Sequence, residues 1–212
     1  MDTTADEGHR GPAPDLTAFL VFHNGLRRDF GRLADVIDRT APDDHDRLRL
    51  VDEHLGMLLR ALHHHHVSED EDIWPMVRAA VPESGPVLAE LEADHATLDE
   101  AIADIPGAAD RATQAAGLRR LQDLLGAHLD REESDVVPLI IAQVDAADWD
   151  RSAKAVVRAW GRDLPSIASW LLDSADERER ERILDAAPLA LRVLYFLRWR
   201  RTYGRRTAQI YG

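Results

Sequence analysis

A polar interruption recurs in four apolar helical patterns of this chain, and it constrains the fold more than any other feature. Each of the four segments repeats apolar side chains at steps of three and four residues, the spacing of one face of an α-helix. Near its middle, each apolar face is interrupted by a histidine, or by a histidine and a glutamate. In chain order the interrupting residues are His23, then His65 with Glu69, then His95, then His128 with Glu132.

The four segments are joined by short connections. They are predicted as helices over about residues 15–39, 45–80, 88–105 and 118–144. Short connections make consecutive helices antiparallel neighbours. Counted from the shared turns, His23 and His65 can meet at one height of the bundle, and His95 and His128 can also meet. The interruptions therefore predict one polar layer inside an otherwise apolar bundle.

Two of the interruptions have the same local sequence. His65 precedes Glu69 by four residues, so both side chains point to one side of a helix. A proline, Pro75, follows the glutamate by six residues, and the same order recurs in His128, Glu132 and Pro138. Each proline frees a backbone carbonyl one turn back, which predicts equivalent kinks beyond the two glutamates. The repeat indicates two halves of one metal site.

Bound metal would explain why six polar side chains occupy a core. A buried imidazole or carboxylate without a partner costs on the order of a few kcal/mol, against a total stability of roughly 5–15 kcal/mol. Four neutral imidazoles and two carboxylates suit a pair of iron ions, bridged by both glutamates and by an oxide or hydroxide. His23 and His65 would complete one iron, and His95 and His128 the other. A position left open would accept O₂, peroxide or NO.

Composition excludes several other kinds of site. The chain contains no cysteine, so disulfides, iron–sulfur clusters and thiol catalysis are excluded. The net charge of -13 argues against nucleic acid as the main partner. No apolar run reaches the roughly 18 residues of a spanning helix, and no signal peptide is visible. We therefore expect a cytoplasmic protein without a transmembrane segment.

Three parts are expected along the chain. Residues 1–14 have no periodicity and are predicted to be a disordered lead, residues 15–144 form the bundle, and residues 145–212 form a helical extension. The end of the extension is both apolar and basic, with six arginines and no acid from residue 186 onward. It could pack on the bundle as an amphipathic helix, dock a protein partner or dimer mate, or contact an anionic membrane surface.

These residues resemble a known family. The two His-x-x-x-Glu pairs in register, with a single histidine before each, are similar to the hemerythrin-like (HHE cation-binding) domain over about residues 15–144. The resemblance implies an all-α fold, an up-down-up-down four-helix bundle, here with additional C-terminal helices. It also implies a non-haem di-iron centre whose ligands are His23, His65, Glu69, His95, His128 and Glu132.

One position departs from the oxygen-carrying invertebrate members of that family. Those proteins have a further histidine in the third helix, four positions from the other, where this chain has Leu91 or Asp99. One iron therefore lacks a nitrogen ligand, and Asp99 or water could fill the gap. This departure disfavours simple reversible oxygen carriage and fits bacterial and iron-sensing members better.

Other polar residues near the six are assigned simpler roles. His63, His64 and His66 point about 100–200° away from His65 and are expected mostly at the surface or behind the ligands. His54 is expected to be a polar residue at the end of the bundle. The acids that directly follow the two glutamates are expected to be solvated charges, with a hydrogen bond to a ligand as the less favoured role; they are Asp70 and Glu133.

Another fold and other metals are alternatives for this pattern. Ferritin-like sites use Glu-x-x-His and more carboxylates, so they fit this histidine-rich pattern less well. Zinc or copper could occupy the same ligands in vitro. The favoured function is a di-iron protein that binds or reduces a small oxidant (O₂, peroxide or NO), as an oxidoreductase if it turns over. The alternative is an iron or oxygen sensor, or an iron-handling protein, that signals through the C-terminal extension.

Overall fold

The computed structural model describes residues 11–212, and all of its regular structure there is helical. Of the predicted disordered lead, residues 1–10 lie outside the described residues, and residues 11–16 form no helix. The elements are α1 (Thr17–Arg39), α2 (His45–Ser68), η1 (Glu69–Ile73), α3 (Trp74–Ala80), η2 (Pro82–Ser84), α4 (Gly85–Ala103), α5 (Arg111–Asp135), α6 (Val137–Gln143), α7 (Ala146–Ala159), η3 (Gly161–Asp163), α8 (Leu164–Ser174), α9 (Glu177–Ala186), α10 (Leu189–Leu194), η4 (Tyr195–Trp199) and α11 (Arg200–Tyr211).

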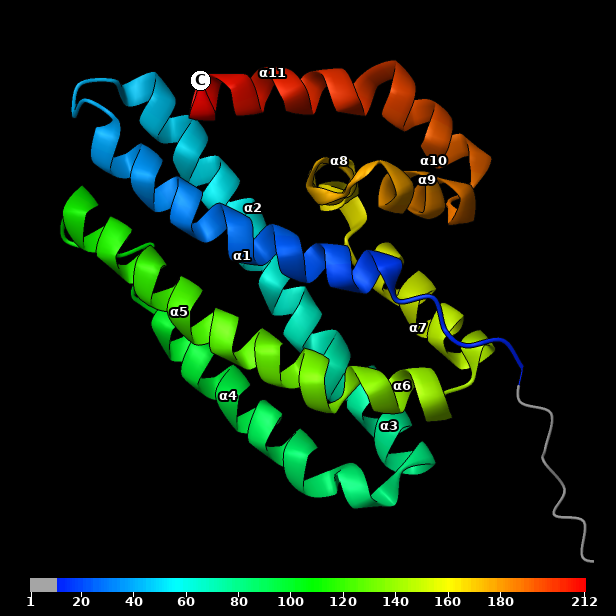
Figure 1. Cartoon of the computed structure of the whole chain (residues 1–212). Helices are drawn as coiled ribbons and strands as arrows, with labels where there is room; N and C mark the ends of the chain where they lie inside the picture. Colours follow the sequence, from blue (N-terminus) through cyan, green and yellow to red (C-terminus); the bar gives the residue numbers. More distant parts are fainter. Residues whose placement is uncertain (1–10) are drawn as a thin grey trace, which may run out of the picture.

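The first two thirds of the chain form the predicted up-down-up-down bundle. Its members are α1, the run from α2 to α3, α4, and the pair α5 and α6; α5 lies between α1 and α4 (Figure 1). Side-chain caps begin two of these helices. The Asp44 carboxylate accepts from the Arg47 backbone N–H at 3.1 Å, and the Asp110 carboxylate accepts from the Thr113 N–H at 2.7 Å. The fold class inferred from the four apolar patterns is confirmed.

The second and fourth helices of the bundle are both irregular just after their buried glutamate, but in different ways. The second helix passes through the π-helical turn η1, which begins at Glu69 and ends before Pro75. The fourth helix stops at Asp135 and restarts at Val137, with Pro138 in the first turn of α6. The two kinks, which were expected to be equivalent, therefore differ in their geometry. A π turn inside an α-helix is rare and commonly marks a functional site.

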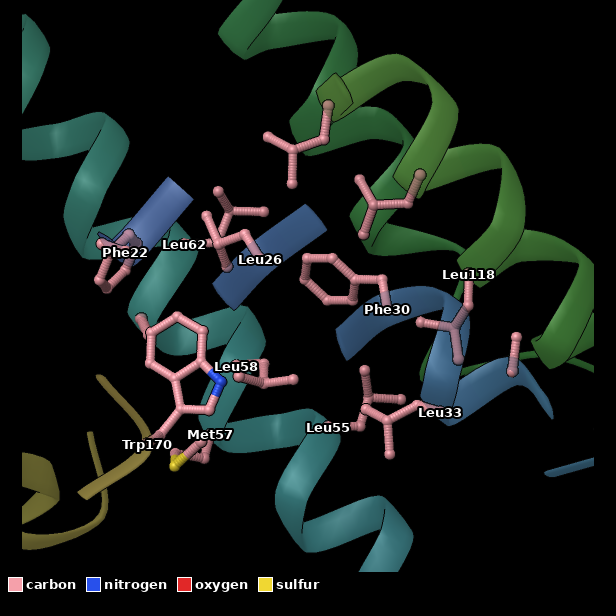
Figure 2. Packing of buried hydrophobic residues seen from close by; sticks show 14 of the residues in the cluster. Phe22, Leu26, Phe30, Leu33, Leu55, Met57, Leu58, Leu62, Leu118 and Trp170 are labelled. Atoms are coloured by element: carbon pink, nitrogen blue, oxygen red, sulfur yellow. The ribbon is translucent and has the colours of Figure 1, made fainter. Parts of the chain in front are cut away.

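Two apolar clusters fill the bundle on either side of the polar layer. Leu16, just before α1, belongs to one cluster and Leu26 of α1 to the other, with His23 between them. On the fourth helix, Leu125 and Val136 flank His128 in the same way. Figure 2 shows the larger cluster, in which side chains from α1, α2, α5 and α8 meet, among them Leu26, Leu58, Leu118 and Trp170.

The C-terminal helices pack against the bundle rather than standing apart. The α8 helix approaches α1 closely at Gly25, where an added Cβ would lie 2.6 Å from Trp170 Cζ2. The Trp170 indole N–H donates to Asp29 Oδ2 at 2.8 Å. The α11 helix lies along α2, where Arg47 donates to the backbone carbonyl of Ile210. No helix within residues 11–212 is long and apolar enough to cross a membrane.

Candidate metal centre

The six side chains singled out in the sequence lie together in the middle of the bundle. His23 comes from α1, His95 from α4, and His128 with Glu132 from α5. His65 lies in the last turn of α2, and Glu69 is the first residue of the π-helical turn η1. All six side chains are buried, and both glutamates are 0% exposed. The helices thus bring together groups that are up to 109 residues apart in sequence, from position 23 to position 132.

One group of side chains surrounds His65. It consists of His23, His65, Glu69 and Glu132, each of which offers one atom within 4.8 Å of the others. His65 Nε2 lies 3.1 Å from Glu69 Oε1, and His23 Nε2 lies 3.6 Å from Glu132 Oε2. Two nitrogens and two carboxylate oxygens at this separation can hold one metal ion.

A second group consists only of histidines. His66, His95 and His128 offer nitrogens within 4.8 Å of one another. The rings of His66 and His95 are stacked with centroids 4.2 Å apart. Glu69 connects the two groups, because its Oε1 faces His65 and its Oε2 lies 3.4 Å from His95 Nε2. A carboxylate placed this way can bridge two metal ions.

His66 is the residue that the sequence reasoning did not assign to the site. It is only 3% exposed, although it points about 100° away from His65. It precedes Glu69 by three residues, and an i, i+3 pair shares a helix face nearly as well as an i, i+4 pair. The i, i+3 spacing to Glu69 is the feature of the sequence from which the position of His66 could have been predicted. The second group therefore offers three histidine side chains, one more than the sequence reasoning counted.

The other residues considered for the gap do not enter the site. Asp99 is exposed on α4, and Leu91 is buried in an apolar cluster. His63 is exposed and His64 is partly exposed, as expected from their direction. His54 is buried in the N-terminal half of α2, where its ring lies near two tyrosines of α11.

The hydrogen-bond inventory tests whether these residues fit a metal. Buried polar atoms in proteins nearly always have a partner. Here eleven nitrogen and oxygen atoms of the two groups are buried without a hydrogen-bond partner, a concentration that metal coordination would satisfy. They are Nε2 of His23, His65, His66, His95 and His128, Nδ1 of His66 and His128, and both carboxylate oxygens of Glu69 and Glu132.

Two carboxylates orient histidines of the site from outside. Nδ1–H of His23 donates to Glu133 Oε1 at 2.8 Å, and Nδ1–H of His95 donates to Asp70 Oδ1 at 2.9 Å. A carboxylate can only accept here, so Nδ1 carries the hydrogen and the Nε2 lone pair faces the other ligands. Asp70 and Glu133 are therefore not free solvated charges. Each directly follows one of the buried glutamates and holds a histidine of another helix.

Burial sets the charge state of the metal-free site. Burial raises the pKa of Glu69 and Glu132 well above the usual range, and their mutual proximity adds to this for Glu132. Burial, followed by the neighbouring imidazoles, lowers the pKa of His128 to about 3. Neutral imidazoles are the form that binds metal. The carboxylates would ionise only with a cation beside them, so the site is suited to take up metal with release of protons.

Glu133 is held ionised. Its partial burial opposes ionisation, but the hydrogen bonds from His23 and Arg27 outweigh it and lower the pKa of Glu133 to about 2. Arg27 Nη1 donates to Glu133 at 2.7 Å, and Arg27 Nη2 donates to Asp130 at the same distance. The arginine thus fixes the carboxylate that orients His23.

Comparisons with known proteins agree with this geometry. The family model of the hemerythrin HHE cation binding domain matches residues 15–140, which is more than half of the 212-residue chain. No curated protein and no solved structure matches the chain at a significant level. The matched range contains both groups of side chains and the two carboxylates that orient them. The chain therefore belongs to the hemerythrin HHE cation-binding domain family.

Proposed function

We propose that the chain is a non-haem di-iron protein that binds or reduces a small oxidant, namely O₂, peroxide or NO. The observation that carries the proposal is the position of Glu69, whose two oxygens face two separate groups of histidines. His23, His65 and Glu132 would hold one iron, and His66, His95 and His128 the other, with Glu69 between them. Bound iron would supply the electrons for reversible binding or reduction.

The protein residues prepare the site for that chemistry in three ways. Burial keeps His65, His66 and His128 neutral, so that their lone pairs are available. Glu133 and Asp70 fix the orientation of His23 and His95. The two apolar clusters above and below exclude water from the polar layer.

The first test is metal content together with an optical spectrum, on protein purified without a tag and without chelator. We expect about two irons per chain, as in other di-iron sites of helical bundles. Titrations with peroxide and NO would then show whether either is consumed. Protein that contains one zinc which iron cannot replace, or no iron after anaerobic loading, would contradict the proposal.

Exposed apolar residues near the C-terminus favour a second candidate function. This candidate is a sensor whose C-terminal extension binds an anionic membrane surface. Five large apolar side chains between residues 189 and 197 are 44–73% exposed: Leu189, Val193, Leu194, Phe196 and Leu197. Exposed arginines follow at positions 198, 200 and 201. An apolar and basic helix of this kind fits the interface of an anionic lipid bilayer.

Two measurements test the sensor. Iron removal by chelator should strongly lower helicity and protease resistance, while peroxide and NO should not be turned over at a useful rate. The protein should sediment with phosphatidylglycerol vesicles but not with phosphatidylcholine vesicles. Leu197→Ser should weaken this sedimentation, whereas Ile141→Ser, at a comparably exposed apolar position outside the tail, should not. Equal sedimentation with both lipids, or with neither, would contradict membrane docking.

A further inference from the structure

A pocket lies where α7 covers the bundle, beside the metal centre but outside it. Its volume is about 140 Å³, and its walls come from α1, α2, α7, α8 and the π-helical turn η1. The side chains that close it toward the core are Phe19, Phe22 and His65, and those of the outer wall include Trp149, Val157 and Trp160. We propose that this pocket binds an uncharged aromatic molecule of about the size of benzene that carries one hydroxyl group.

The size and lining of the pocket exclude ions and favour an aromatic ring. An apolar cavity of roughly 150 Å³ in a protein stays dry and accepts benzene. Four of the lining side chains are aromatic, and they offer both ring faces and ring edges to a planar guest. The one acid at the rim is Asp15, which already accepts from Arg182 at 2.8 Å and from the Thr17 hydroxyl at 2.6 Å. No free charge in the wall would neutralise a charged guest.

A single polar atom specifies the hydroxyl group. The Ser152 Oγ on α7 is buried and has no hydrogen-bond partner, and Ser152 lines the pocket. The other serine in the wall, Ser68, already donates to the carbonyl of His65 at 2.8 Å. The Trp149 indole N–H is also used, because it donates to the carbonyl of Asp15 at 3.1 Å. A phenolic hydroxyl could either donate to or accept from Ser152, and either hydrogen bond would satisfy the buried serine oxygen.

The pocket and the metal centre share a wall. The Phe19 ring lies 4.3 Å from the His23 ring and 5.5 Å from the His65 ring, measured between centroids. The Phe22 ring lies 5.1 Å from the His65 ring, also between centroids. A guest in the pocket therefore contacts rings that pack directly on the metal-binding histidines. The binding proposal itself does not depend on which metal these histidines hold, so it stands or falls apart from the proposed function.

Calorimetric titration of the full-length protein, with the metal that it carries after purification, tests the proposal. Phenol should bind with a dissociation constant of about 1 mM or lower. Benzene should bind roughly three- to tenfold more weakly, as expected for the loss of one hydrogen bond, and benzoate should not bind. Absence of saturable phenol binding by folded protein would overturn the proposal.

Two variants and a matched control locate the site. Ser152→Ala should weaken phenol binding to the level of benzene and leave benzene unchanged. Val157→Phe should fill the pocket and weaken both ligands at least about tenfold. Ala155→Phe adds the same ring to an exposed position of α7 that does not line the pocket, and it should change neither. If Val157→Phe bound both ligands as Ala155→Phe does, or if Ser152→Ala kept the preference for phenol, the pocket would not be the site.

Discussion

At the scale of single residues, His66 decides whether the second group offers two histidines or three. Its ring stacks on His95, and both of its nitrogens are buried without a partner. His64, two positions earlier, is partly exposed and belongs to neither group. A comparison of variants at His66 and His64 therefore separates a metal-binding role of His66 from a general effect of removing a histidine from this run.

We predict that His66→Leu lowers iron content toward one ion per chain, because the second group keeps only His95 and His128. His64→Leu should keep the wild-type content of about two irons. Metal analysis after identical anaerobic loading and gel filtration measures both variants, and circular dichroism verifies that they are folded. Equal iron content in the two variants would remove His66 from the site.

The carboxylates behind the ligands give a second residue-scale prediction. Glu133→Gln would replace the ionised acceptor of His23 by a neutral amide, and loss of such an outer partner typically weakens metal binding 10–100-fold. Asp130→Asn is the matched control, since Asp130 contacts the same Arg27 but is 77% exposed and touches no histidine of the site. Competition with a chelator of known affinity measures the change. A loss of the same size in both variants would assign the effect to Arg27 instead of His23.

At the scale of elements, the packing of α8 against α1 depends on one glycine. An added Cβ at Gly25 would lie 2.6 Å from Trp170 Cζ2 and 2.7 Å from Ser174 Oγ. Trp170 is fully buried and is held by its hydrogen bond to Asp29, so it has little room to move. The close approach of α8 to α1 therefore requires glycine at this position.

We predict that Gly25→Ala lowers the free energy of unfolding by about 1–3 kcal/mol, the usual effect of overpacking. Gly126→Ala should instead raise it by about 0.5–1 kcal/mol, because nothing lies within 4 Å of the added Cβ and alanine favours the helix. Urea denaturation of the two variants measures this difference in sign. Stabilisation by Gly25→Ala would show that α8 is not held against α1 as described.

At the scale of the whole molecule, the extension docks on the bundle over a buried polar junction. His54 of α2 lies there with Tyr203 and Tyr211 of α11, at ring distances of 6.2 and 6.0 Å. Asp29 is also buried in this region, where Arg28 and Arg32 donate to it. Burial is the main cause that lowers the pKa of His54 to about 4; the charge of Asp29 opposes this shift, and the nearby arginines add to it.

This junction predicts a pH dependence of stability. A histidine whose pKa is lower in the folded protein stabilises it fully above the unfolded pKa of about 6.5. As pH falls from about 6.5 to about 4, the unfolded chain takes up a proton that folded His54 cannot, and about 3 kcal/mol is lost.

The free energy of unfolding of wild type and of His54→Leu should be measured at several pH values. As pH falls from about 6.5 to about 4, it should decrease by about 3 kcal/mol less in the variant than in wild type. The histidines of the two buried groups are present in both proteins, so their contribution cancels in the comparison. His45→Leu, at the exposed start of α2, should behave as wild type. Parallel pH profiles for wild type and His54→Leu would contradict a buried neutral His54.

The sequence alone determined the helical class, the four-helix bundle and the six side chains in its polar layer. This was possible because helical periodicity and i, i+4 spacing are local: His65 and Glu69 share a face whatever packs against them. Only the tertiary structure decided the roles of His66, Asp70 and Glu133, because each depends on which helix lies on its side of the bundle. The pocket beneath α7 and the burial of His54 under α11 were also decided there. Both are made by segments far apart in sequence, and no local pattern specifies where such segments meet.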